Sequence, residues 1–353
     1  MNELSAARIE INDIDAQLRV LFEQRMHTAA KIAQYKKAND LPVLDTARED
    51  EVIKRNVDAL CDDSLRTLYD AFVRNNMALS RAYQAQILCE NVVAFQGVNG
   101  AFSHIALKAL FPFAQTLSVL SFKEVFDAVE TSKAKYGILP LENSFAGDVS
   151  EVLDLCFERA LNVVNVYDLP VTHNLLSVKG AKLSDIDKVY SHSQAISQCS
   201  RFLQSLNVKT YPYPNTALAA KYVADSNDIT IGAIASAETA ALYGLDILAK
   251  DINTSVHNTT RFIVISKERL QNGNRFSLLF TVEHKAGSLA AVVEAIGSMG
   301  FNLECIKSRP MPDLAWQYYF YAEIIGSSKL ANELVSSLSS ICKTVRILGV
   351  YQK

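Results

Sequence analysis

The sequence NTTRFIVIS at residues 258–266 decides how the middle of this chain is organised. Two threonines and an arginine stand directly before Phe262 and a run of aliphatic residues, which predicts a buried strand that carries polar side chains to a cleft. Thr260, Arg261 and Phe262 are therefore candidate site residues. A plainer alternative remains open here, in which the threonine pair only starts a core strand, because β-branched residues favour strands by themselves.

The composition is that of a soluble globular protein with two or three domains. The 353 residues are 49% hydrophobic and 21% charged, and the formal net charge of −3 argues against binding to nucleic acid or anionic lipid. No apolar run approaches the length of a membrane span. Six cysteines are spread without a Cys-x-x-Cys pair, and no histidine pair has metal-ligand spacing. We therefore expect a cytoplasmic protein with no metal, no cofactor and no disulfide framework.

The first ninety residues predict three helices of unequal length. Apolar residues recur every seven positions from Leu4, and no Gly or Pro precedes Pro42, which predicts one helix over about residues 3–37. Asp45 is a candidate N-cap for a second helix that ends near residue 60, and a third follows over about 64–89. Two short helices cannot cover so long a first helix, so we expect an intertwined homodimer or a higher homo-oligomer.

Cationic and amide side chains recur on the faces of these helices. Arg25 occupies an apolar column, and Lys36 lies eleven residues later, about 20° around the helix, so both could reach one anion. Ser80 and Gln84 share a face of the third helix. The structural alternative is a set of salt bridges between subunits, and these residues alone do not exclude it.

Eight polar positions on the three helices resemble the active-site set of the all-helical chorismate mutases. They are Arg8, Arg25, Lys36, Asp45, Arg48, Glu49, Ser80 and Gln84. The resemblance implies that residues 1–90 rearrange the dianion chorismate to prephenate. It implies that Arg8 of one subunit and Arg25 and Arg48 of the other hold the carboxylates. Lys36 and Gln84 would donate to the ether oxygen, where negative charge grows, and Glu49 would hold the ring hydroxyl.

Residues 91–268 alternate short apolar runs with helical segments, which predicts an α/β region of two lobes with a cleft between them. Strands are expected near residues 92–95, 136–139, 163–166, 188–191, 229–234 and 262–265. Helices are expected near residues 103–110, 122–131, 149–159, 195–206, 217–224 and 235–243. Asn143, Ser144, Ser191 and Gln198 follow expected strands, where ligands bind in such folds. Each also has a routine capping explanation, as does Thr216.

Five strings in this region resemble prephenate dehydratase, in order: GVNGAFSH, LPLENSFAG, YSHSQAISQC, ALYGL and NTTRF, which begin at residues 97, 139, 190, 241 and 258. The resemblance implies a fold like that of periplasmic binding proteins, and conversion of prephenate to phenylpyruvate. Thr260 would help the ring hydroxyl to leave, and Arg261 and Phe262 would shape the pocket. Asn143, Ser191 and Gln198 would bind substrate, with Ser144 beside them.

Residues 274–353 have the expected order β-α-β-β-α-β, which is ferredoxin-like. Strands are expected near 275–283, 303–308, 318–325 and 345–351, and helices near 287–299 and 330–339. This segment resembles an ACT domain, which implies feedback binding of phenylalanine at a subunit interface. Two departures concern the regulatory motifs. The usual Pro-Gly-Ala-Leu is Ala286, Gly287, Ser288 and Leu289, and the usual Glu-Ser-Arg-Pro is Lys307, Ser308, Arg309 and Pro310. The lysine reverses a local charge.

These features together predict a bifunctional enzyme of phenylalanine biosynthesis, in which a chorismate mutase precedes a prephenate dehydratase and a regulatory domain. Neither site uses a metal or a covalent intermediate in this prediction. Two alternatives stay open. The two-lobed region could be a sensor of a small anion, with helices that only dimerise, or only one of the two catalytic domains could be active.

Overall fold

The structure is a computed structural model, and it describes residues 3–39, 46–87, 92–255, 257–311, 314 and 316–353. The chain forms two compact units, one of residues 1–92 with 113–115, and one of residues 93–112 with 116–353. Each unit is described by itself. No helix in the described ranges combines the length and the apolar character that a membrane crossing requires.

The first unit contains the three expected helices. They are α1 (Glu3–Ala38), α2 (Thr46–Asp58) and α3 (Arg66–Ile87), with the short 3-10 turn η1 (Asp63–Leu65) before α3. Its small core includes Met26, Ala33 and Val73, which are less than a tenth exposed. Much of the apolar face of α1 is uncovered in the single chain, since Ile11 is 59% and Leu21 is 60% exposed.

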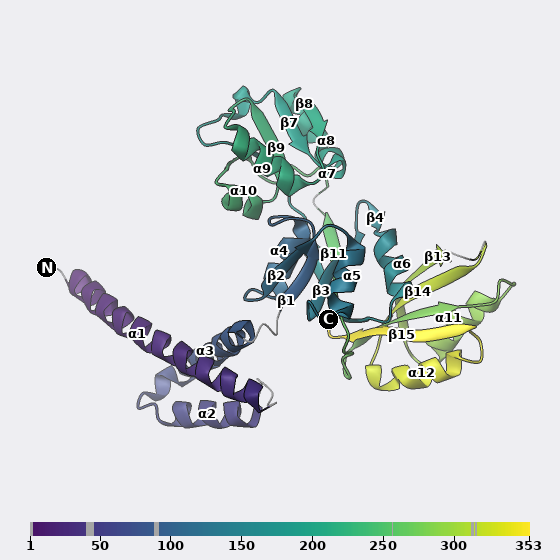
Figure 1. The fold of residues 1–353 in the computed structure, drawn as a ribbon, viewed down its shortest axis with the longest axis horizontal. Helices are drawn as coiled ribbons and strands as arrows, with labels where there is room; N and C mark the ends of the chain where they lie inside the picture. Colours follow the sequence, from purple (N-terminus) through teal and green to yellow (C-terminus); the bar gives the residue numbers. More distant parts are fainter. Residues whose placement is uncertain (1–2, 40–45, 88–91, 256, 312–313, 315) are drawn as a thin grey trace. The chain divides into compact units, whose positions relative to one another are not determined.

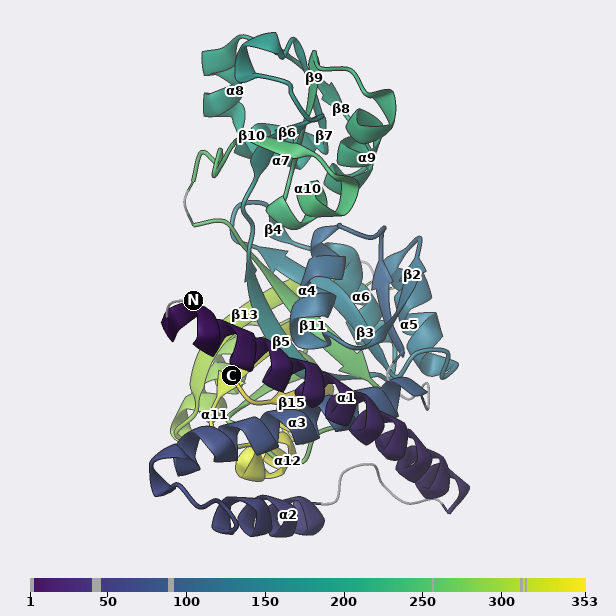
Figure 2. The ribbon, with the colours of Figure 1, turned by 90° about the vertical axis from the view of Figure 1, so that its left-hand side faces the viewer.

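The second unit begins with the lobe that contains the NTTRF sequence. Its sheet has the order β5-β11-β3-β1-β2, and strand β11 runs antiparallel to both of its neighbours. Helices α4, α5 and α6 lie against strand β3, and α5 also contacts β11 (Figure 2). The strands are β1 (Val92–Gln96), β2 (Gln115–Val119), β3 (Tyr136–Asn143), β4 (Gly147–Asp148), β5 (Asn162–Pro170) and β11 (Thr259–Ser266). The helices are α4 (Phe102–Leu110), α5 (Phe122–Glu130) and α6 (Ser150–Glu158).

The second lobe is inserted between β5 and β11 and has its own five-stranded sheet, of order β10-β6-β9-β7-β8. The two expected lobes are therefore present (Figure 1). The strands are β6 (Asn174–Ser177), β7 (Lys188–Ser191), β8 (Lys209–Pro212), β9 (Ile231–Ala235) and β10 (Asp246–Ala249). The helices are η2 (Leu183–Asp185), α7 (Ser193–Gln198), α8 (Ser200–Leu206), α9 (Thr216–Ser226) and α10 (Ala237–Tyr243).

The C-terminal segment has the expected β-α-β-β-α-β order. Its antiparallel sheet, of order β13-β14-β12-β15, is packed on α11 and α12 around a core that includes Phe276, Val292 and Leu334. The elements are β12 (Arg275–Thr281), α11 (Ser288–Ser298), β13 (Asn302–Pro310), β14 (Tyr318–Ile325), η3 (Ser328–Leu330), α12 (Ala331–Leu338) and β15 (Thr344–Tyr351). Strand β15 also pairs with β5 of the first lobe, at Gly349 and Val163, so one continuous sheet runs through both.

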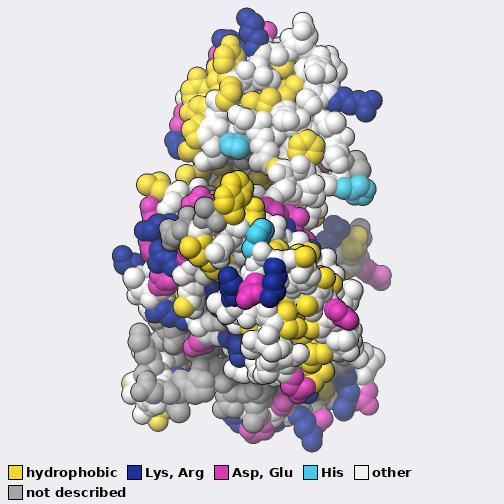
Figure 3. Space-filling view, turned by 90° about the vertical axis from the view of Figure 1, so that its right-hand side faces the viewer, with side chains coloured by type: hydrophobic (Ala, Val, Ile, Leu, Met, Phe, Trp, Pro, Cys, Tyr) yellow, Lys and Arg dark blue, Asp and Glu magenta, His cyan; other side chains and the backbone are white. Residues whose placement is uncertain are grey.

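One face of the molecule carries both acidic and basic side chains. On the face in Figure 3, lysine and arginine side chains are interspersed with aspartate and glutamate. This face therefore has no extended basic surface of the kind that binds nucleic acid, in keeping with the formal net charge of −3.

Candidate active sites

Thr260 and Asn143 are opposite each other on the paired strands β11 and β3. The Asn143 amide nitrogen donates to the Thr260 hydroxyl over 2.9 Å and to the Asn258 side-chain oxygen over 2.9 Å. The Asn143 oxygen accepts from the backbone N–H groups of Phe145 and Ala146 at 3.0 and 2.9 Å. These four contacts fix the orientation of the Asn143 amide, so that Thr260 receives a hydrogen bond and keeps its own proton to donate.

Gln198 and His173 form a second buried pair, on the other lobe and its connection. The Nε2 atom of His173 lies 2.8 Å from the Gln198 side-chain oxygen, and His173 is only 2% exposed. A carbonyl oxygen only accepts, so this contact places the proton on Nε2. Burial lowers the pKa of His173, although the hydrogen bond to Gln198 opposes this shift, so the ring is neutral at pH 7. The Gln198 amide nitrogen then remains as a donor.

A cavity of about 640 Å³ lies between the two lobes and brings these two pairs to one space. Its lining includes Asn143, Thr260, Phe262, Ser103, His173, His192, Gln198 and Thr216. Neither Lys nor Arg is among the described residues that line it. Two acidic residues, Asp148 and Glu151, are in its lining, and helices α4 and α9 begin beside it, where the helix dipole has its positive end. Helix α4 begins at Phe102 behind Ala101, which has no side chain to cap the first N–H groups.

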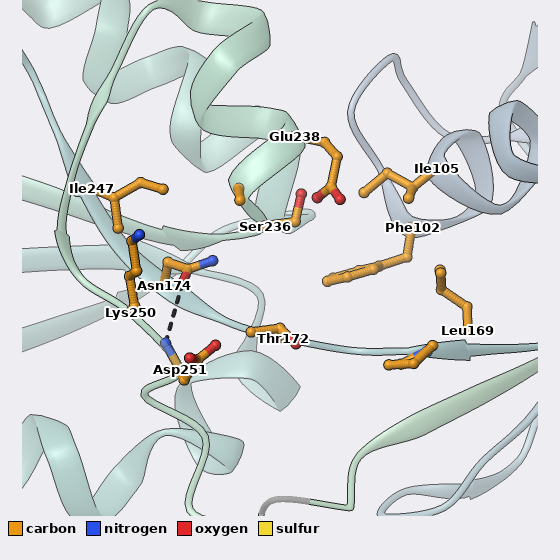
Figure 4. Close-up of a pocket in the computed structure, with 12 residues that line it drawn as sticks. Phe102, Ile105, Leu169, Thr172, Asn174, Ser236, Glu238, Ile247, Lys250 and Asp251 are labelled. Atoms are coloured by element: carbon orange, nitrogen blue, oxygen red, sulfur yellow. Dashed lines mark hydrogen bonds between the residues drawn. The ribbon is translucent and has the colours of Figure 1, made fainter.

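A smaller cavity of about 250 Å³ shares Phe102 with the larger one. Figure 4 shows the Phe102 ring extending towards the side of the second lobe that carries Ser236 and Asn174. The Phe102 ring also meets His173 edge-on, with ring centroids 5.6 Å apart. Phe102 therefore separates the two cavities and packs directly on the buried His173–Gln198 pair.

Three of the expected substrate-binding residues lie outside the lining of the larger cavity. Ser144 donates to the backbone oxygen of His257 at 2.9 Å, and the fully buried Ser191 donates to the backbone oxygen of Ile234 at 2.7 Å. Arg261 points away from Thr260, as expected for adjacent residues of a strand, and pairs with Asp168 and Glu323. These three side chains therefore make contacts within the protein and do not line the cavity.

In the helical unit, Arg25 and Ser80 meet between α1 and α3. The Arg25 guanidinium donates to the Ser80 hydroxyl and, over 2.8 Å, to the backbone oxygen of Asn76. Burial lowers the pKa of Arg25. A hollow of about 730 Å³ is lined by apolar residues of all three helices and by Asp15, Arg19, Arg25, Asn56 and Asn76. Apart from Arg25, none of the described residues expected in the mutase set is in its lining. Gln84, one turn after Ser80, is buried, and its side-chain oxygen has no partner in the described part of the chain.

The other residues expected in the mutase set have mixed positions. Glu49 on α2 forms an ion pair with Arg81 on α3, which sequence reasoning did not single out, and Arg48 pairs with Glu51 over 2.7 Å. Lys36 is half-buried near the end of α1, whereas Arg8 is exposed near its start. Asp45 lies outside the described residues. Among the described residues, no group of three or more His, Cys, Asp or Glu could hold a metal ion.

Comparison with known proteins agrees with this division into two sites. The family model for chorismate mutase type II matches residues 7–85, and the model for prephenate dehydratase matches residues 93–270. A bifunctional chorismate mutase/prephenate dehydratase of Aquifex aeolicus is 30% identical over 100% of this chain and 99% of its own length. This chain belongs to the chorismate mutase/prephenate dehydratase family. It is an enzyme with one domain of each kind, and so a protein of phenylalanine biosynthesis.

Two solved structures resemble the chain beyond its mutase domain. A prephenate dehydratase from Arthrobacter aurescens in complex with L-Phe has a TM-score of 0.67 and 26% identity, over 74% of this chain and 90% of that one. A protein described as GqqA, a novel type of quorum quenching acylase, has a TM-score of 0.68 and 29% identity, over 74% of this chain and 97% of that one. Both support the two-lobed fold of the dehydratase domain.

Sequence reasoning missed two contributors to the dehydratase site. It gave no role to His173, which is in the cavity lining and contacts Gln198. It also passed over Asn258, whose side-chain oxygen helps to orient Asn143. Asn258 is the first residue of the NTTRF string, so the sequence did contain a signal for it. Thr216 does not cap α9, because the side chain of Asn215 accepts from the Leu218 N–H at 2.7 Å.

The expected regulatory residues fall in two segments of the C-terminal domain. Gly287 precedes α11 with a φ of +86°, and Ser288 and Leu289 open that helix. Ser308, Arg309 and Pro310 end β13, and Ser308 pairs with Phe320 on β14. A hollow of about 350 Å³ has Ser288, Leu289 and Phe320 in its lining, whereas Ser308, Arg309 and Pro310 are not among its lining residues. Arg309 instead contacts Asp154 of α6, at 2.7 and 3.1 Å.

Proposed function

We propose that this enzyme rearranges chorismate to prephenate in its helical domain and converts prephenate to phenylpyruvate in the cavity beside β3 and β11. The observation that carries the second step is the hydrogen bond from Asn143 to Thr260 at the cavity wall. Because Thr260 accepts this hydrogen bond, its own hydroxyl proton can be donated to a ligand in the cavity, which is also lined by Phe262. The match of both family models to the chain supports the same reading.

In the dehydratase step, the ring hydroxyl of prephenate leaves as water after it gains one proton, and the ring carboxylate leaves as carbon dioxide. The electron pair of the broken carbon–carbon bond completes the aromatic ring. Thr260 contributes a hydrogen bond to the departing oxygen, because a threonine hydroxyl is too weak an acid to be a free proton source. The Gln198 amide donor and the uncapped N–H groups of α4 suit the anionic carboxylates.

In the mutase step, no proton moves, so orientation and charge are sufficient. Arg25 and Arg48 would hold the carboxylates, while Lys36 and Gln84 would donate to the ether oxygen as the bond breaks. Gln84 is buried and its side-chain oxygen lacks a partner among the described residues, whereas the role proposed here requires its NH2 group to donate to the ligand. Asp45, Glu49 and Ser80 would complete the binding site.

The mutase site would need a second subunit, which would supply Arg8. The exposed apolar side chains of α1 support this proposal, because about half of the surface of Ile11, Ile14 and Leu18 is uncovered in the single chain. A homodimer in which α1 helices pack on each other would bury these side chains, at about 25 cal/mol per Å² of apolar surface removed from water.

The C-terminal domain would be an ACT domain that binds phenylalanine. The order of its sheet supports this assignment, as does the hollow that Ser288 and Leu289 line beside Phe320. The related dehydratase from Arthrobacter aurescens was solved in complex with L-Phe. Phenylalanine is the product expected downstream of phenylpyruvate, so its binding would provide feedback inhibition.

Incubation with chorismate tests the proposal as a whole. The full-length protein should accumulate prephenate and then phenylpyruvate, detected by the loss of chorismate absorbance and the appearance of the phenylpyruvate enolate in alkali. A small-anion sensor would return both substrates unchanged. An enzyme with one active domain would convert only chorismate or only prephenate, and parallel assays on the two compounds distinguish these cases.

A further inference from the structure

The strands β3 and β11 present two pairs of side chains in opposite directions. Asn143 is opposite Thr260 in the ladder, and the preceding and following residues, Glu142 and Arg261, are opposite each other. Side chains alternate between the faces of a sheet. Asn143 and Thr260 line the dehydratase cavity, whereas Glu142 and Arg261 are absent from its lining and contact the C-terminal domain.

Lys307 of β13 forms an ion pair with Glu142. Its ammonium group lies 2.7 Å from the Glu142 carboxylate and also pairs with Asp148 of β4. The Lys307 side chain is only 10% exposed. Glu142 and Asp148 are themselves register partners, so Lys307 joins the two strands of the β3–β4 hairpin, and Asp148 is also in the lining of the cavity. The hairpin contains the Asn143 side chain and the two backbone N–H groups that orient it.

Glu323 of β14 forms an ion pair with Arg261. Its carboxylate lies 3.0 Å from the Arg261 guanidinium, and the Glu323 side chain is 1% exposed. Arg261 also contacts Asp168 of β5 at 2.9 Å. Burial opposes the charge on Arg261, yet the hydrogen bond to Asp168 and the attraction of Glu323 together raise its pKa. Loss of Arg261 would leave the negative charge of Glu323 buried without a counter-charge, which is strongly destabilising.

We propose that Lys307 and Glu323 are positioning residues for the dehydratase reaction: from the C-terminal domain, they hold Glu142 and Arg261 so that Asn143 and Thr260 keep their places at the cavity. This inference rests on the proposed dehydratase function. It also gives a physical role to the departure at residue 307. A glutamate there, the more usual residue of the motif, would place three carboxylates together, whereas Lys307 joins two of them.

The test compares steady-state kinetics of full-length variants on prephenate and on chorismate. Lys307→Met and Glu323→Gln should each lower the dehydratase kcat at least tenfold, because small displacements of reacting groups cost about that much or more. The KM for prephenate should stay within about twofold, and the mutase kcat should not change. Lys329→Met is the matched control, since Lys329 is an exposed cation of the same domain and its loss should leave both activities intact.

Charge reversal separates positioning from general loss of structure. Lys307→Glu should be more damaging than Lys307→Met, and adding Glu142→Lys should restore most of the dehydratase kcat, because the two partners then exchange roles. Should Glu323→Gln fail to fold, as judged by circular dichroism, the Lys307 series still decides. A dehydratase kcat equal to that of the wild type in Lys307→Met, or a double variant no better than Lys307→Glu, would overturn the inference.

Failure of this inference is distinguishable from failure of the proposed function. A Thr260→Ala variant that keeps full dehydratase activity would contradict the assignment of the cavity itself, whatever the Lys307 variants do. An inactive Thr260→Ala together with an unaffected Lys307→Met would contradict only the role of the C-terminal residues.

Discussion

The side-chain amide of Asn143 donates a hydrogen bond of 2.9 Å to the hydroxyl oxygen of Thr260. Among the described residues, Thr260 has no other side-chain partner, so its proton is available to a ligand in the cavity. This geometry makes the direction of the hydrogen bond, and not the acidity of threonine, the important property. Substitutions that keep or remove the hydroxyl group should therefore differ sharply.

Thr260→Ala should lower the dehydratase kcat by about 10² to 10³, the range for removal of one positioned hydrogen-bond donor. Thr260→Ser keeps the hydroxyl and should retain a substantial part of the activity. Mutase activity on chorismate should be unchanged in both variants, because the site is in another domain. Parallel assays of phenylpyruvate formation and chorismate consumption measure this difference, and an alanine variant as active as the serine variant would contradict it.

Lys36→Ala should abolish mutase activity and leave dehydratase activity on added prephenate intact. The ammonium group is expected to stabilise negative charge that appears only in the transition state, so kcat should fall more than KM rises. Lys31→Ala is a suitable control, because Lys31 is an exposed lysine on the same helix. Near-normal turnover in Lys36→Ala would remove this residue from the site.

The protein should sediment as a dimer or larger oligomer. Ile11→Glu should shift the equilibrium towards monomer, because it places a charge on an exposed apolar face of α1 that the dimer would bury. Mutase activity should fall with dissociation, since Arg8 would no longer reach its partner's site, whereas Asp13→Ala, also on α1, should change neither property. Analytical ultracentrifugation checks this, and a monomeric wild type would exclude the dimer.

Stability of the dehydratase domain should fall as the pH drops below about 6.5, in part through His173. Burial lowers the pKa of His173 in the folded state below its value of 6.5 in the unfolded chain. The unfolded state therefore binds more protons in this interval, so the free energy of unfolding decreases as the pH falls through the folded pKa. Thermal melts at about pH 7.5 and 5.5 should show a smaller loss of Tm in His173→Gln than in the wild type. Equal losses would contradict this assignment.

Phenylalanine should bind to the full-length protein in calorimetry, and tyrosine should bind more weakly. Leu289→Glu should weaken phenylalanine binding, because it introduces a carboxylate into the hollow beside Phe320. The dehydratase kcat without effector should stay unchanged in this variant. Absence of heat with both amino acids would contradict the sensing role of this domain.

Long-range periodicity was the most informative signal in the sequence. The absence of Gly and Pro before Pro42 predicted α1 to within about a residue of its end. Strand β7 coincided with its predicted bounds of 188–191. Short strands were missed where period and burial did not agree, since all four residues of β8 are exposed and all four of β6 are buried. The helix predicted over 195–206 is interrupted at Cys199, which ends α7 and precedes α8.

The candidate dehydratase site could be located from sequence, but its side-chain directions could not. Strings at 139–147 and 258–262 placed Asn143 and Thr260 correctly at the cavity. Arg261 was expected in the same pocket, but side chains alternate along a strand, so it points to the other face of the sheet, where it pairs with Glu323, 62 residues away in sequence. Ser191 was also expected to bind substrate, but its hydroxyl donates to the backbone oxygen of Ile234, a contact that depends on how β7 and β9 pair. Contacts of this kind arise only from tertiary structure.

The pairing of β5 with β15 affects any truncation of this enzyme. At Gly349, a Cβ atom would meet the Val163 backbone oxygen, so the two strands approach too closely for any larger residue. A protein truncated before β12 would leave the free margin of β5 open to other chains, which is a known route to aggregation. Loss of inhibition in such a fragment would then be confounded by insolubility, and point substitutions in the intact chain are the sounder way to dissect it.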